Sequence, residues 1–123
     1  MPKFSRRSKA NLATCHQDIQ KVMNEAIKHI DFMVLCGHRG KKDQDSAFLS
    51  GNSKLRYPKS KHNSIPSTAI DLSPYPLDWD DINSFCFLAG FIMGTAKQLG
   101  VELEWGGHWK KFLDYPHYQI KKK

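Results

Sequence analysis

The sequence predicts a small single α+β domain in which an antiparallel sheet is flanked by helices. Its 123 residues suffice for one hydrophobic core but not for two. With 40% apolar residues, including seven Phe, four Tyr and three Trp, that core can offset chain entropy without disulfides. Helical and strand-like segments follow one another without regular βαβ alternation, which favours α+β.

The first predicted helix begins near Thr14. Thr14 and Gln17 resemble a capping box. Apolar residues then recur at spacings of three and four and form one stripe: Ile19, Val22, Met23, Ala26, Ile27 and Ile30. This face should pack into the core.

Two further helices are expected. Residues 41–50 predict a short helix that Gly51 terminates. A longer, strongly periodic helix begins at Asp80 and Asp81 and ends at Gly100. The longer helix is the clearest element in the sequence.

Short apolar runs predict four strands, at residues 32–36, 69–72, 101–105 and 118–120. A polar segment of residues 52–67 separates the first two. Loops of this length are uncommon in compact domains and are frequently functional. We therefore expect functional residues in this segment.

The chain is basic, with 19 Lys and Arg against 12 Asp and Glu, a net charge of +7. It should be attracted to polyanions such as nucleic acid, anionic lipid or bacterial envelope polymers. Part of the excess lies near the ends, where solvated tails are the simplest interpretation: Arg6, Arg7, Lys9 and Lys121 to Lys123. A basic nucleic-acid-binding module is one alternative, and it predicts salt-sensitive binding that chelators leave unchanged.

Three cysteines, Cys15, Cys36 and Cys86, are odd in number and contain no CxxC pair. This argues against a disulfide framework and a cysteine-rich zinc knuckle, so reduced and mostly buried thiols are expected. A Cys-dependent hydrolase using Cys36 and His38 is a further alternative. It is disfavoured because strand neighbours point to opposite faces and structural thiols are commoner.

Three residues match the donor set of a catalytic zinc site: His62, Asp71 and His117. Such sites use three nitrogen or oxygen ligands and leave a fourth position open. The spacing alone is a weak signal, because the chain has six histidines and a lone loop histidine is usually solvated.

Four ordered blocks strengthen this interpretation: Ser60-Lys61-His62, Ala69-Ile70-Asp71, Trp105-Gly106-Gly107 and Asp114-Tyr115-Pro116-His117-Tyr118. Together with Ser5-Arg6-Arg7-Ser8 and Leu35-Cys36-Gly37-His38-Arg39, they resemble phage endolysins of the D-alanyl-D-alanine carboxypeptidase type. That family is related to the vancomycin-resistance D,D-dipeptidases and, in fold, to the hedgehog signalling domain. The resemblance runs from about residue 5 to residue 120.

The resemblance implies one Zn²⁺ per chain, with His62, Asp71 and His117 as ligands. It also implies Asp114 as general base and Arg39 facing the scissile carbonyl. The implied activity is L-alanyl-D-glutamate endopeptidase action on the peptidoglycan stem peptide. A D-Ala-D-Ala carboxypeptidase of the same fold is the alternative.

The sequence departs from the family pattern in two places. Asp71 follows His62 by nine residues, whereas seven is the commonest spacing in the family; a longer loop can preserve both ligands. His108 stands where the family usually has Asp, near the expected substrate. Ser60 is expected either to bind substrate or to cap the loop.

The resemblance further implies one zinc peptidase catalytic domain over residues 1–123, without a separate cell-wall-binding domain. The first thirty residues contain no signal-peptide apolar region, and no segment has membrane-spanning length. We therefore expect a monomer made in the host cytoplasm without a signal peptide. It would reach the wall through a holin and bind no specific nucleic acid.

Overall fold

Four strands form one antiparallel sheet in the order β1-β2-β4-β3. The computed structural model describes residues 2–121. In chain order its elements are α1 (Arg6–Leu12), α2 (Gln17–Ala26), β1 (Phe32–Cys36), α3 (Lys41–Leu49), η1 (Lys61–Asn63), β2 (Ala69–Pro74), α4 (Ile82–Gln98), β3 (Leu103–Trp105), η2 (Gly106–His108) and β4 (His117–Ile120). The predicted α+β class is confirmed.

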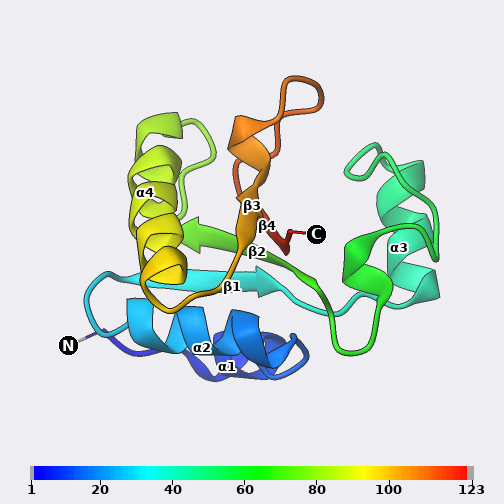
Figure 1. Cartoon of the computed structure of the whole chain (residues 1–123). Helices are drawn as coiled ribbons and strands as arrows, with labels where there is room; N and C mark the ends of the chain where they lie inside the picture. Colours follow the sequence, from blue (N-terminus) through cyan, green and yellow to red (C-terminus); the bar gives the residue numbers. More distant parts are fainter. Residues whose placement is uncertain (1, 122–123) are drawn as a thin grey trace.

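The sheet lies between α4 at one end and α3 at the other, with α1 and α2 along the β1 side (Figure 1). Helix α4 packs against α2, β2 and β3, while α1 packs against β1. The strand register pairs Cys36 of β1 with Asp71 of β2, and Asp71 with His117 of β4. Three strands therefore meet at the end of the sheet nearer α3.

The apolar stripe of α2 is buried as predicted, with Ile19, Val22 and Met23 fully inaccessible. The predicted start of this helix was wrong. His16 is the N-cap, and its ring accepts a hydrogen bond from the Asp18 amide at 3.0 Å.

Thr14 does not cap α2, because hydrogen bonds fix the chain just before this helix. The Cys15 backbone forms an isolated bridge with Ser67. The Thr14 hydroxyl donates to Asn11 O at 2.6 Å and accepts from the His38 amide at 2.8 Å. It therefore joins the N-terminal region to the loop after β1.

The basic N-terminal segment is the helix α1, which corrects its interpretation as a solvated tail. The Ser5 hydroxyl caps it by accepting from the Ser8 amide at 3.1 Å. The buried Ser8 hydroxyl accepts from the Val34 amide at 3.0 Å, which fixes α1 against β1. At the other end, the Lys121 amide donates to Glu102 O at 3.0 Å, while Lys122 and Lys123 lie outside the described residues.

Helices α3 and α4 end where predicted. Gly51 and Gly100 follow them with φ of +83° and +76°, a left-handed conformation that favours glycine after a helix. Asp81 caps α4 by accepting from the Ser84 amide at 3.2 Å. The glycine and capping rules therefore located both helices from local sequence.

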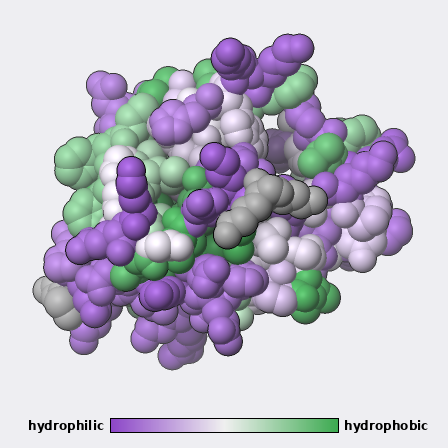
Figure 2. All heavy atoms as spheres, viewed as in Figure 1, coloured by the Kyte–Doolittle hydropathy of each residue, from purple (hydrophilic) through white to green (hydrophobic). Residues whose placement is uncertain are grey.

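Hydrophilic residues gather over the lower part of the face viewed in Figure 2, where α1 and α2 lie. Within residues 2–121, no helix is both long and apolar enough to cross a membrane. The cysteines are free, as expected. Only Cys15 is buried, whereas Cys36 is half-buried and Cys86 exposed, so the expectation of mostly buried thiols was wrong.

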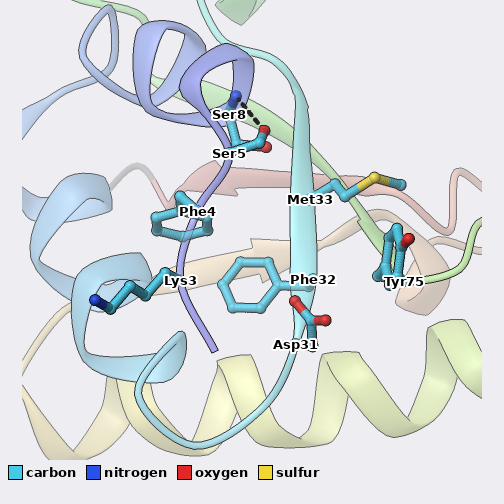
Figure 3. Close-up of a pocket in the computed structure, with 8 residues that line it drawn as sticks. All are labelled: Lys3, Phe4, Ser5, Ser8, Asp31, Phe32, Met33 and Tyr75. Atoms are coloured by element: carbon cyan, nitrogen blue, oxygen red, sulfur yellow. Dashed lines mark hydrogen bonds between the residues drawn. The ribbon is translucent and has the colours of Figure 1, made fainter. Parts of the chain in front are cut away.

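A surface hollow of about 250 Å³ lies between the N-terminal segment and the start of β1 (Figure 3). Phe4 and Phe32 form its apolar floor, and Tyr75 stands at its edge. It opens at the opposite end of β1 from Cys36, so it is separate from the place where the three strands meet.

Truncating the buried face of α4 should destabilise the fold. Ile92 is completely buried, and Ile92→Ala should lower the free energy of unfolding by about 2–5 kcal/mol, because it leaves a cavity. Phe87→Ala on the same helix, where the side chain is 71% exposed, is the control and should change it by less than about 0.5 kcal/mol. Urea denaturation measures both; equal effects would contradict this packing.

Candidate metal centre

The three predicted ligands lie together at the end of the sheet. His62 comes from η1, Asp71 from β2 and His117 from β4. The Nε2 atom of His62 and the Nδ1 atom of His117 lie 3.2 Å and 3.3 Å from the same oxygen, Oδ1 of Asp71. Residues separated by up to 55 positions in the chain therefore form one cluster.

The hydrogen bond at Nδ1 of His62, the ring nitrogen that points away from Asp71, determines which nitrogen faces the cluster. Its Nδ1 lies 2.7 Å from Gly37 O, and a carbonyl only accepts, so Nδ1 carries a proton. Nε2 is therefore the nitrogen that can offer a lone pair toward Asp71. The Ser60 hydroxyl caps this short helix by accepting from the His62 amide at 3.2 Å, which holds the ring in place.

The outward nitrogen of His117 is fixed in the same way. Its Nε2 lies 2.8 Å from Oε1 of Gln119. The amide N–H of Gln119 donates to Glu104 at 3.5 Å, so the Gln119 oxygen faces the ring and accepts a hydrogen bond from Nε2–H of His117. The Nδ1 lone pair of His117 is then available on the Asp71 side. Outer partners of this kind orient metal-bound histidines.

Two imidazole lone pairs and a carboxylate oxygen thus converge, and such a set requires protons or a cation between them. Burial by itself would lower the pKa of His62, but Asp71 and, to a smaller extent, Cys36 raise it from 6.5 to about 10. Burial would raise the pKa of Asp71, but hydrogen bonds from His117 and His62 hold it well below its ordinary range. Metal binding displaces protons from such ligands.

The donor set suits one metal in particular. Two imidazoles and one carboxylate are a common ligand set for catalytic zinc and suit borderline cations. His62 and His117 are buried, while the Asp71 side chain is 19% exposed, so the cluster is largely shielded but reachable. Residues of this kind could hold a divalent metal ion, and the ligand atoms that lie within 4.8 Å of one another are those of His62, Asp71 and Cys36.

Arg39 lies on the other side of Asp71. Its Nη2 is 3.5 Å from Oδ2 of Asp71, and its Nη1 donates to Oε1 of Gln44 at 3.0 Å. Asn63 donates to Arg39 O at 2.9 Å and to the same Gln44 oxygen at 3.1 Å. The guanidinium is thus held at the cluster by a buried network.

Asp114 lies in the loop before β4. Its amide donates to Gly106 O at 3.1 Å, and a Cβ on Gly106 would collide with the Asp114 carbonyl oxygen. This close approach explains the glycine. Burial, followed by the negative charge of Asp71, raises the pKa of Asp114. The charges of His117, His62 and Arg39 lower it, but by less. Its carboxyl therefore belongs to the same electrostatic site.

The two predicted substrate-binding residues lie differently. Ser60 has the capping role described above, one of the two expected for it. His108 is exposed on η2, and its ring packs edge-on against Trp105 with centroids 4.9 Å apart. Its substrate contact stays a prediction.

The sequence analysis missed the role of several residues around the site. Cys36 was set aside with His38 as its partner, but His38 instead contacts Ser64 O at 3.0 Å. Ligand atoms of Cys36, His62 and Asp71 lie within 4.8 Å of one another. Strand β1 ends at Cys36, so the strand alternation used against a Cys36–His38 pair does not extend to His38. Gln44 and Gln119 were also missed, because an isolated amide carries no sequence signal.

Comparisons with known proteins agree with one another. The sequence profile of the family "phage L-alanyl-D-glutamate peptidase" matches residues 1–123. The L-alanyl-D-glutamate peptidase of Escherichia phage T5 is 34% identical over 126 residues, covering 98% of this chain and 90% of that protein. The peptidoglycan L-alanyl-D-glutamate endopeptidase CwlK of Bacillus subtilis (strain 168) is 34% identical over 110 residues, covering 77% of this chain and 64% of that protein.

A solved structure is also similar. The crystal structure of the Serratia marcescens L-Ala D-Glu endopeptidase ChiX superposes with a TM-score of 0.80 at 27% sequence identity. The match covers 97% of this chain and 90% of that one. The arrangement of helices around the sheet is therefore shared with that enzyme.

The His62–Asp71 pair should make the stability of the metal-free protein depend on pH. The pKa of His62 is raised on folding, so its contribution is fully present below about pH 6.5 and is lost as pH rises through about 10. When a chelator keeps the protein metal-free, the free energy of unfolding should fall by about a few kcal/mol between these two pH values. Asp71→Asn should remove most of this fall in denaturant titrations. An unchanged slope in that variant would contradict the assignment.

Proposed function

The chain belongs to the phage L-alanyl-D-glutamate peptidase family, and from this premise we propose that it is a zinc-dependent peptidoglycan endopeptidase. It cleaves the bond between L-Ala and D-Glu in the stem peptide. His62, Asp71 and His117 would hold one zinc ion per chain.

One observation supports the metal most directly: both histidines have their outward nitrogens committed. Gly37 O and Gln119 Oε1 accept from them at 2.7 Å and 2.8 Å. The inward lone pairs then face an ionised carboxylate oxygen. These electron-rich atoms repel one another unless a proton or a cation lies between them. A cation near Oδ1 of Asp71 would remove this repulsion.

When bound, zinc supplies Lewis acidity, which makes water a stronger acid and polarises a peptide carbonyl. Asp114 is the general base in this proposal: its carboxylate takes a proton from water and returns it to the leaving amine. Arg39 places its guanidinium beside Asp71, where it can stabilise negative charge that develops on the scissile carbonyl oxygen. Gln44 keeps that guanidinium from swinging into solvent.

The surface charge favours the proposed substrate. Stem peptides carry carboxylates, and the segment that leads to His62 contains Lys54, Arg56, Lys59 and Lys61. Lys54 lies 5.4 Å from the centre of the Phe112 ring, so the loop before η1 contacts the loop after η2. These basic residues would attract the anionic wall generally, as charge of this sign does at long range.

The proposed cleavage can be tested on purified peptidoglycan. Products identified by mass spectrometry after labelling of new amino groups should carry new amino termini on D-Glu. A chelator should abolish the reaction and added Zn²⁺ restore it, because the ligands must hold a metal to act. His117→Ala should lose both metal content and activity.

Other products would distinguish the alternatives. Release of free D-Ala alone would replace this proposal with the carboxypeptidase of the same fold. Salt-sensitive binding to DNA, with no hydrolysis in either the presence or the absence of zinc, would favour the nucleic-acid-binding module.

Asp114→Asn should lower kcat by about 100- to 10,000-fold, because the amide cannot accept the proton. The pKa of Asp114 is raised, so wild-type activity should be lost as pH falls through a value above the ordinary range of an aspartate. Measured kcat/KM against pH should show this acidic limb, and the variant's residual activity should lack it.

Asp78→Asn, in the exposed loop before α4, is the matched control for the lost charge. It should keep the wild-type profile. Zinc content should be unchanged in Asp114→Asn, since Asp114 is not a proposed ligand. Wild-type kcat in that variant would contradict its role as base.

A further inference from the structure

Cys36 lies beside the proposed zinc ligands. It ends β1 and is the register partner of Asp71. Side chains of directly paired residues in an antiparallel sheet lie on the same face, and the bulge after Val34 places Cys36 in that register. The thiol therefore lies on the metal side of the sheet.

The Cys36 sulfur lies close enough to His62 and Asp71 for the three residues to bind one ion. The Cys36 sulfur lies within 4.8 Å of ligand atoms of both His62 and Asp71. Around a tetrahedral zinc, a sulfur and a nitrogen ligand are about 3.6 Å apart, from bond lengths of about 2.3 Å and 2.1 Å. From 4.8 Å, the sulfur would have to approach by at most about 1.2 Å to reach this separation.

The contacts of the thiol hold it beside Asp71. Arg39 Nη2 donates to the Cys36 sulfur at 3.7 Å and lies 3.5 Å from Oδ2 of Asp71, so one guanidinium nitrogen contacts both groups. A nucleophilic role does not suit this arrangement. His62 is the adjacent histidine, and its two nitrogens already contact Gly37 O and Asp71, so neither is free to act as the thiol's base.

We propose that the Cys36 thiolate is a fourth protein ligand of the metal, which closes the site in a resting state. This inference rests on the zinc site of the proposed function. Catalytic zinc needs one open position, and His62, Asp71, His117 and Cys36 together fill a tetrahedral ion. The thiolate therefore competes with water for the fourth position and must leave before hydrolysis. A sulfur ligand also shifts the site toward softer metals.

The test replaces zinc with Co²⁺, whose absorption reports sulfur ligation. Wild-type protein titrated with Co²⁺ should show an intense near-ultraviolet sulfur-to-cobalt charge-transfer band at one ion per chain. Cys36→Ser and Cys36→Ala should lose this band while keeping the weaker visible bands of nitrogen and oxygen ligation. Zinc affinity of both variants should fall at least about tenfold, since even outer-shell losses cost this much.

Cys86→Ser is the matched control, because Cys86 is an exposed thiol on α4. It should keep the charge-transfer band. A wild-type spectrum identical to that of Cys36→Ser would overturn the thiolate ligand while leaving the three-ligand site intact. Failure of the wild-type chain to bind one Co²⁺ at all would instead overturn the metal site and, with it, this inference.

Discussion

The convergence of two imidazole nitrogens on one oxygen of Asp71 is the constraint on which the rest of the site depends. The nitrogens lie 3.2 Å and 3.3 Å from Oδ1. Each histidine has its other nitrogen fixed by an acceptor outside the cluster, so the ring orientations are set before any ligand arrives. This preorganisation costs stability unless a proton or a cation neutralises the cluster, which is the physical basis on which we propose a metal centre.

The sheet supplies the positions of these groups. Antiparallel pairing of β2 with β4 brings Asp71 opposite His117, 46 positions later in the chain. Pairing of β1 with β2 adds Cys36 on the other side of Asp71, and the same strand end leads into Arg39. The core packing of α4 against β2 and β3 holds this register. The packing that stabilises the core therefore also sets the geometry of the site.

The loops add charged groups near this cluster. Gly106 lets the Asp114 backbone pass closely, and burial together with the charge of Asp71 raises the pKa of Asp114. Arg39 is held by Gln44, which is completely buried and fully hydrogen-bonded. The proposed base Asp114 and the fixed cation Arg39 thus both interact electrostatically with Asp71, and proton transfer and oxyanion stabilisation need two such groups.

The sequence by itself determined the fold class and the ends of α3 and α4, and it predicted that His62, Asp71 and His117 form one group, because periodicity, glycine stops and ordered motifs are local signals. It missed α1, misplaced the cap of α2, and did not connect Cys36 with His62 and Asp71. For His117 the partner, Gln119, lies two residues away on the same strand. For His62, tertiary structure alone decided that Nε2 faces Asp71, because Gly37 becomes the partner of Nδ1 only when distant segments come together. Hydrogen-bond geometry between such segments is a property of the register, and no single stretch of sequence contains it.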